Sequence, residues 1–267
     1  MSGGPAGFRL VIHPKMEGRL DMAIDQALME AVGDGRSAQT VRLYGFSPAT
    51  LSLGRFQRVK GTLLAENLIR DGVTLVRRPT GGHAVLHDEE LTYSVALSKA
   101  LIAERLGDSR KQTVYEFTAE ILLAGLSRLG IAGKINVTRQ GDIRNPDCFR
   151  SSGEFEISAA DGRKLIGSAQ MTTRTAILQH GSIPLANPGR RVSRYLSTQQ
   201  PADSYEPTSL NEQTRRCLSF EEVQSAFAAA FRERLNAEES GLRAEEEDAA
   251  AQFLDLRFSR DEWNLEY

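Results

Sequence analysis

Between Phe8 and about Leu185, short runs of strand-forming residues alternate with longer stretches in which apolar residues recur at helical spacing. Gly or Pro bounds these runs, as is typical of strands. Several runs follow one another with few helices between them, which favours a mixed sheet over a purely parallel one. The pattern predicts an α/β fold of the α+β kind, a mixed β-sheet with flanking helices. The predicted strands are FRLVI (8–12), TVRLYG (40–45), ATLSLG (49–54), VTLVRR (73–78) and LTYSVAL (91–97).

Two helices and a hairpin are predicted among these strands. An apolar stripe in LDMAIDQALMEAVG, which Gly33 ends, predicts the first helix. Thr113 and Glu116 have the spacing of a capping box, and a second predicted helix continues to Gly130. Further along, EFEIS and KLIGSAQ flank the turn AADGR (159–163), which predicts a β-hairpin.

The C-terminal part of the chain has a different pattern. Residues 186–211 are aperiodic and rich in Pro, Ser and Arg, which predicts an irregular connection. We therefore expect one domain over 8–211 and a helical C-terminal extension over 212–267 packed on it. Within the extension, SFEE (219–222) predicts a capped helix start. The acidic residues 245–248 indicate a second, solvated helix start.

Composition and charge exclude several classes of protein. The 40% hydrophobic and 25% charged content argues against disordered and coiled-coil chains. The 33 Lys and Arg against 35 Asp and Glu give a net charge of -2, which attracts neither nucleic acid nor an anionic membrane. No apolar run approaches the roughly 20 residues that span a bilayer, and no signal peptide is recognisable. We expect a cytoplasmic monomer without nucleic-acid or membrane partners.

The segment RRPTGGHAVLHD (77–88) is the first candidate site. Two arginines end a predicted strand and a Gly-Gly turn follows, so that Arg77, Arg78 and the backbone at Gly81 and Gly82 can approach an anion closely. The segment has neither the Lys and Ser/Thr of a Walker A loop nor the spacing of a dinucleotide fingerprint. Residue types alone favour the alternative, a hairpin turn with surface arginines.

Cys148, in NPDCFRSS, is the second candidate. This stretch is polar and turn-like, so its thiol is more accessible than one in an apolar strand. A nearby positive charge would favour the thiolate, and Arg144, Arg150 and Lys164 are possible sources. The alternative is an unreactive structural cysteine, for which Cys217 is the comparison. Two cysteines make neither a disulfide framework nor a four-thiolate metal site.

Lys164, which follows the predicted hairpin turn, is the third candidate. It is either a solvated charge or a desolvated lysine that takes up a proton or stabilises a developing anion. Gly167 and Ser168, just beyond it, would let a ligand approach the backbone closely. The spacings of His and Cys predict no metal site. The histidines that could serve as acid, base or structural group are His83, His87 and His180.

Six blocks of the sequence, in order along nearly the whole chain, resemble the biotin/lipoate protein ligase superfamily. Within it, the chain is most similar to the cysteine-dependent octanoyltransferases of the LipM type. These carry a nucleophile where Cys148 stands, have HDEELTYS where ligases tend to have a Gly-Asn segment, and lack the accessory domain that bacterial ligases commonly add. The blocks are LDMAIDQALME, VRLYGFSPATLSLGRFQ, VRRPTGGHAVLHDEELTYSV, DCFRSSGEFEISAADGRKLIGSAQ, LQHGSIPL and DEWN.

The resemblance implies a biotin/lipoate protein ligase-like catalytic domain over 8–211 and an acyltransferase without a cofactor. Cys148 would be the nucleophile that accepts the acyl group, and Lys164 the essential lysine of the GRK-x-x-GSA motif. The residues implied for substrate binding are Arg77, Arg78, Gly81, Gly82, His83, Gly167, Ser168, Ala169 and His180.

The implied reaction moves an octanoyl group from acyl carrier protein, through a thioester on Cys148, to a lysine of glycine cleavage H protein or of a lipoyl domain. It belongs to lipoate biosynthesis and consumes no ATP. Oxyanion donors are expected near Gly82 or in a turn over 167–169. An apolar slot would hold the eight carbons. Candidates to line it are Val76, Val85 and Tyr93.

Four alternatives stay open at the level of sequence. An ATP-dependent lipoate-protein ligase would use Lys164 and residues 77–82 to hold an acyl-adenylate. An amidotransferase would move octanoyl from H protein to lipoyl domains through the same cysteine. A noncatalytic acyl-binding or carrier-binding protein would keep the fold without turnover. A cysteine hydrolase would need a His with a following Asn or Asp partner, and none stands out.

Overall fold

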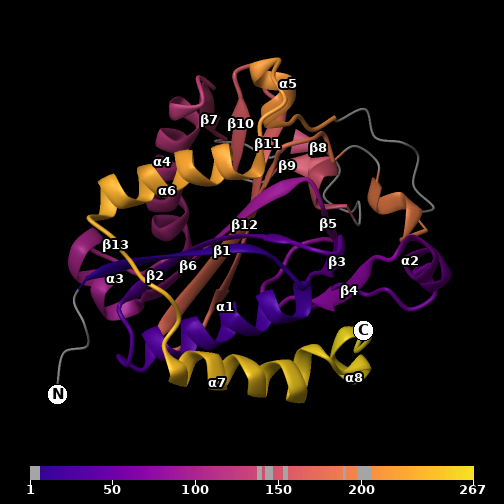
Figure 1. Cartoon of the computed structure of the whole chain (residues 1–267), viewed down its shortest axis with the longest axis horizontal. Helices are drawn as coiled ribbons and strands as arrows, with labels where there is room; N and C mark the ends of the chain where they lie inside the picture. The colour runs from indigo at the N-terminus through magenta and orange to yellow at the C-terminus, as the bar shows by residue number, and fades with distance from the viewer. Residues whose placement is uncertain (1–6, 137–139, 142–146, 153–155, 189–190, 198–205) are drawn as a thin grey trace.

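A mixed sheet of eight strands forms the centre of the computed structural model (Figure 1), which describes residues 7–136, 140–141, 147–152, 156–188, 191–197 and 206–267. Strand β1 pairs in parallel with β2 and β13, and the other neighbours are antiparallel, so the predicted mixed sheet is confirmed. In sheet order the strands are β13 (Glu238–Glu239), β1 (Phe8–Met16), β2 (Gln39–Phe46), β6 (Glu90–Ser98), β12 (Ala176–Pro184), β11 (Lys164–Thr172), β10 (Ile157–Ala159) and β7 (Gly133–Ile135).

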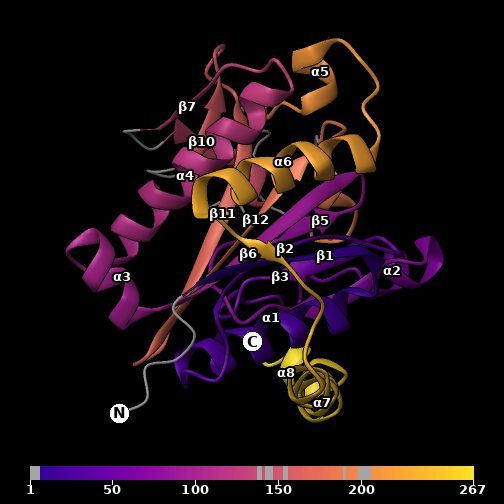
Figure 2. The same ribbon diagram turned by 60° about the vertical axis from the view of Figure 1, so that its left-hand side comes forward.

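Helices cover both faces of this sheet. Helices α4 (Lys111–Arg128) and α6 (Phe220–Leu235) lie on one face, and α1 (Gly18–Gly33) and α7 (Ala244–Phe253) lie on the other (Figures 1 and 2). Each face has its own apolar core. The predicted helices and the hairpin between β10 and β11 are confirmed.

The alternation of side chains along a strand sends opposite sets of residues to the two faces. On β6, Leu91, Tyr93 and Val95 enter the core under α4 and α6, whereas Ala96 enters the core under α1. Thr92 and Ser94 therefore share the face of α1. The same rule holds for β12, where Ile177 and Leu178 belong to different cores, so His180 and Ser182 lie with Leu178 on the α1 face. Polar side chains thus gather on the face of α1.

A second sheet of three strands stands beside the α1 face. In it β3 (Thr50–Leu53) pairs in parallel with β4 (Thr74–Arg77) and antiparallel with β5 (Val85–His87). A third apolar core lies beneath this sheet and includes Leu51, Leu53 and Leu196. The remaining elements are α2 (Ala65–Asp71), α3 (Lys99–Leu106), β8 (Gln140–Gly141), η1 (Cys148–Arg150), β9 (Ser151–Ser152), η2 (Arg191–Arg194), α5 (Leu210–Thr214), η3 (Leu254–Phe258) and α8 (Asp261–Asn264).

Three helix starts test the capping predictions. Helix α4 begins at Lys111, so the predicted capping box is wrong, because the hydroxyl of Thr113 donates to Asp108 instead. Ser219 caps α6 as predicted, with its Oγ 3.1 Å from the amide of Glu222. Residues 245–248 do begin α7, but the prediction of a solvated start is wrong for Glu246. Its carboxylate is buried, where it accepts hydrogen bonds from the side chains of Arg9 and Ser37.

The C-terminal residues are mostly helical and also complete the sheet. Strand β13 pairs with β1, and α6 shares a core with α4. Across the ranges that the structure describes, no helix is both long enough and apolar enough to cross a membrane.

The loop after β3 and the loop between β4 and β5 touch at Gly54 and Gly82. A side chain added at this contact is predicted to lower stability strongly. A Cβ at Gly54 would lie 1.8 Å from the carbonyl oxygen of Gly82, whose own φ of +92° favours glycine. Gly54→Ala is expected to lower the free energy of unfolding by about 3 kcal/mol, because the loops must separate. Urea denaturation measures this. Gly81→Ala is the control and should change stability by less than about 0.5 kcal/mol, because a Cβ added at Gly81 would meet no heavy atom within 4 Å beyond its chain neighbours.

Candidate active site

The backbone of the glycine-rich segment holds Cys148 in place. The amide of Cys148 donates to the carbonyl of Ala84 at 2.9 Å, next to a bridge between Ala84 and Asp147. Asp147 then caps the short helix η1, since its Oδ1 accepts from the amide of Phe149 at 2.9 Å. The thiol is half-buried, whereas the comparison thiol of Cys217 is exposed. Cys148 thus lies against the 77–88 segment, although the two are some 60 residues apart in the chain.

Lys164 lies beside this thiol. Its Nζ is 3.6 Å from Cys148 Sγ and 2.8 Å from the carbonyl oxygen of the same residue. The lysine is 1% exposed, which excludes a solvated surface charge. Its Nζ also lies 2.8 Å from Oε1 of Glu156, and a carboxylate this close favours the charged ammonium. A positive charge therefore stands next to the sulfur, and Glu156 is a partner that sequence reasoning did not name.

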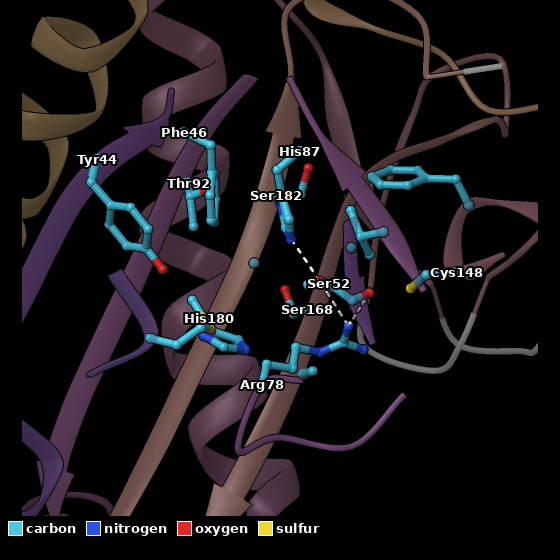
Figure 3. A pocket seen from close by; sticks show the side chains of 16 residues that line it. Tyr44, Phe46, Ser52, Arg78, His87, Thr92, Cys148, Ser168, His180 and Ser182 are labelled. Carbon is cyan, nitrogen blue, oxygen red and sulfur yellow. Dashed lines mark hydrogen bonds between the residues drawn. The ribbon is translucent and has the colours of Figure 1, made fainter. Parts of the chain in front are cut away.

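A pocket with an empty volume of about 420 Å³, part of it open to solvent, extends from Cys148 between the two sheets (Figure 3). Val85 lines it, as predicted. The predictions for Val76 and Tyr93 are wrong, because Val76 packs under α1 and Tyr93 turns into the opposite core. The lining residues are Met22, Tyr44, Phe46, Ser52, Arg78, Val85, His87, Thr92, Cys148, Phe149, Gly167, Ser168, Ala169, His180, Gly181 and Ser182.

Arg78 is the cation in the wall of this pocket. It is 4% exposed, and its guanidinium donates to the carbonyls of Gly81 at 2.8 Å and His83 at 2.7 Å. It also donates to the hydroxyls of Ser52 at 3.0 Å and Thr80 at 3.2 Å. Burial lowers its pKa to about 10, and the nearby Cys148 opposes that effect. Arg78 is thus charged at neutral pH.

The other residues expected to bind substrate divide into two groups. Gly167, Ser168, Ala169 and His180 line the pocket, but residues 167–169 lie within strand β11 and form no turn. Arg77, Gly81, Gly82 and His83 do not line it.

The buried guanidinium of Arg77 supports the loop after β3. It donates to the carbonyls of Gly54 at 2.7 Å and Gln57 at 2.9 Å. Of the other suggested cations, Arg144 and the side chain of Arg150 lie outside the described residues.

His180 connects the pocket wall to helix α1. Its Nε2 lies 2.6 Å from the hydroxyl of Thr80, and its Nδ1 lies 3.1 Å from Oδ2 of Asp25. Burial lowers the pKa of His180, against the effect of Asp25, so the imidazole is neutral at pH 7. Sequence reasoning missed Asp25, and the signal was there, because a carboxylate on the apolar face of a helix needs a buried partner.

The comparisons with known proteins agree with this geometry. The family model described as lipoyl protein ligase A/B catalytic domain matches residues 17–232. This chain is a member of that family. It is 35% identical to octanoyltransferase LipM of Geobacillus kaustophilus, covering 92% of this chain and 93% of the relative. It is 32% identical to octanoyltransferase LipM of Bacillus subtilis, covering 91% and 92%. The chain is an acyltransferase of the LipM type.

Solved structures show the same fold. A structure of a putative lipoate protein ligase from T. acidophilum with bound lipoic acid superposes with a TM-score of 0.77 and 23% identity. It covers 98% of this chain and 100% of the other. A lipoate-protein ligase A bound with ATP gives 0.79, also at 23% identity, and covers 98% and 99%.

Proposed function

We propose that this octanoyltransferase carries octanoyl from acyl carrier protein, as a thioester on Cys148, to a lysine of a lipoyl domain or of glycine cleavage H protein. The observation that carries the proposal is the 3.6 Å contact between Cys148 Sγ and the buried ammonium of Lys164, at the wall of a largely apolar pocket. The relatives named octanoyltransferase LipM support octanoyl transfer in lipoate biosynthesis.

The first half of the reaction is a thioester exchange. The Cys148 thiolate attacks the carbonyl carbon of octanoyl acyl carrier protein, a carbon–sulfur bond forms, and the carrier thiolate leaves with the electron pair of the bond that breaks. One thioester replaces another, so the step needs no ATP. The Lys164 ammonium favours the thiolate before the attack and can supply a proton to the departing sulfur.

The second half forms an amide. The ε-amine of the acceptor lysine attacks the Cys148 thioester, and the thiolate leaves once the amine has lost a proton. Lys164, which pairs with Glu156, has given its proton to the carrier thiolate in the first half of the reaction. Its neutral amine can then take the proton that the attacking acceptor amine loses. This order uses Lys164 as an acid first and as a base second.

The pocket supplies the selectivity for the acyl chain. Its apolar lining includes Met22, Phe46, Val85 and Phe149. Each methylene that enters gains about 0.8 kcal/mol. An eight-carbon chain is therefore held far more tightly than a short one.

Intact-protein mass spectrometry tests the donor and the nucleophile together. We expect a single octanoyl adduct, removable by hydroxylamine, after mixing the protein with octanoyl acyl carrier protein without ATP. Cys148→Ser should show no such hydroxylamine-labile adduct, because an ester would replace the thioester. Octanoylation of a lipoyl domain that requires octanoate and ATP would establish the ligase reaction instead, because a ligase holds its acyl-adenylate without a covalent bond to the enzyme. An adduct that appears only with octanoylated H protein would establish the amidotransferase.

A further inference from the structure

The guanidinium of Arg78 is a buried charge that neutral groups surround. Its bonds go to backbone carbonyls and to the hydroxyls of Ser52 and Thr80. Within the described part of the chain, no carboxylate forms an ion pair with it. Burying a charge without an oppositely charged partner costs free energy of folding, so its presence in the pocket wall indicates a function for the charge. The two hydroxyls therefore matter, because each leads to a carboxylate.

The first hydrogen-bond chain, which links Arg78 to Asp25, runs through Thr80. Arg78 can only donate, so Thr80 Oγ1 accepts from Arg78 Nε at 3.2 Å and its own proton goes to His180 Nε2 at 2.6 Å. The proton of His180 is then on Nδ1 and points to Asp25 at 3.1 Å. Asp25 in turn accepts from Arg42 and Ser94. One tautomer of His180 satisfies the whole chain.

The second chain runs through Ser52 and has the same order of groups. Ser52 Oγ accepts from Arg78 Nη1 at 3.0 Å and donates to His87 Nε2 at 2.8 Å (Figure 3). His87 Nδ1 then donates to Oε1 of Glu90 at 2.6 Å. Glu90 also accepts from Thr92 at 2.6 Å. With a neutral imidazole, this arrangement satisfies every donor and acceptor in the series.

The two chains start on different elements and end on the same guanidinium. Asp25 is on α1, and Glu90 begins β6, yet each is linked to Arg78 by one imidazole and one hydroxyl. Each buried polar group needs a hydrogen-bond partner, and a single partner for each group would meet that need. That need does not require two hydroxyl–imidazole–carboxylate chains to converge on one cation in the wall of a pocket that also contains Cys148.

We propose that Asp25 and Glu90 are positioning residues for acyl transfer, which through His180–Thr80 and His87–Ser52 fix the charge of Arg78 where it stabilises the Cys148 thiolate. The proposal rests on the proposed function, in which Cys148 is the nucleophile. All guanidinium protons are engaged, so Arg78 acts as a fixed charge and not as a proton donor. Because the guanidinium is buried, solvent screens its charge little, and the charge acts over several ångströms without the cost of reorganisation.

The test measures thiolate formation without any acyl donor. In a Cys217→Ala background, Cys148 is the chain's one thiol, and its alkylation by iodoacetamide is followed by intact mass as a function of pH. Thr80→Val keeps the volume but removes the hydroxyl, and Glu90→Gln removes the charge that ends the other chain. Each is expected to raise the pH midpoint of alkylation by about half a unit to one unit. In the transfer reaction, kcat of both variants should fall by a larger factor than KM changes.

Matched variants separate positioning from general damage. Thr80→Ser restores the hydroxyl and should restore the midpoint. Thr118→Val makes the same change as Thr80→Val at a buried hydroxyl on α4, on the other face of the main sheet and outside the pocket lining, so its midpoint should equal that of the parent. In an Arg78→Met background, whose midpoint should already be raised, Thr80→Val should add nothing, because both changes act through the same charge.

Each outcome decides the proposal. If folded Thr80→Val and Glu90→Gln proteins keep the parent midpoint, or if Arg78→Met does, the proposal is wrong. If either Thr80→Val or Glu90→Gln fails to fold, the other variant still tests the hydrogen-bond chain to which its residue belongs. If the midpoints shift as expected while Cys148 never accepts octanoyl, the positioning stands and the proposed function fails. The two failures are therefore distinguishable.

Discussion

Cys148→Ala is expected to lower the rate of octanoyl transfer by roughly 10³-fold or more, because no other group in the site can form the thioester. The half-buried thiol contributes little packing, so the fold should remain intact. The measurement is the initial rate of octanoylation of a lipoyl domain, with octanoyl acyl carrier protein as donor and thermal melting as the check on folding.

Cys217→Ala is the matched control for this substitution. It removes the other thiol, which is exposed and does not line the pocket, so the transfer rate should be unchanged. A Cys148→Ala protein that transfers octanoyl at the wild-type rate would disprove the thioester mechanism. Loss of transfer in Cys217→Ala would show that the wrong cysteine has been assigned.

Lys164→Met is expected to lower the transfer rate by about 10²-fold to 10⁴-fold, the usual range for loss of a positioned acid or base. The substitution also leaves Glu156 as a buried carboxylate without the ammonium that lies 2.8 Å away, so it should lower stability as well. Transfer kinetics and urea denaturation together separate these two effects.

A double variant separates the loss of activity in Lys164→Met from its loss of stability. Lys164→Met with Glu156→Gln removes both charges of this ion pair and should recover most of the lost stability, because replacing a buried ion pair by neutral side chains costs less than removing one partner. Activity should stay low. If stability and activity return together, Lys164 has only a structural role, and the acid and base of the reaction must be sought elsewhere.

Local patterns in the sequence were sufficient for most of the fold. The spacing of apolar residues predicted α1 and the strands of the sheet, since each depends on residues a few positions apart. The capping prediction at Thr113 was wrong for a local reason, because that hydroxyl donates to Asp108 and the N-cap is Arg110, three residues earlier than expected.

The site was predictable where its residues belong to the motifs that carry the family resemblance. Cys148, Arg78 and residues 167–169 were expected there from the resemblance and do line one pocket, and Lys164 contacts Cys148 at its wall. Arg77 ends β4 and stands next to Arg78 in the same motif, yet it points away from the pocket and supports the loop after β3, since successive side chains of an extended chain point to opposite sides.

The sequence by itself determined which elements form, which face of each is apolar, and which residue types are available for chemistry. Only the tertiary structure decided the electrostatics of the site. Glu156 pairs with Lys164 and Asp25 reaches Arg78 through His180 because strands and helices from distant parts of the chain pack together. Contacts of that kind depend on distance and burial in three dimensions, and no spacing along the chain encodes them.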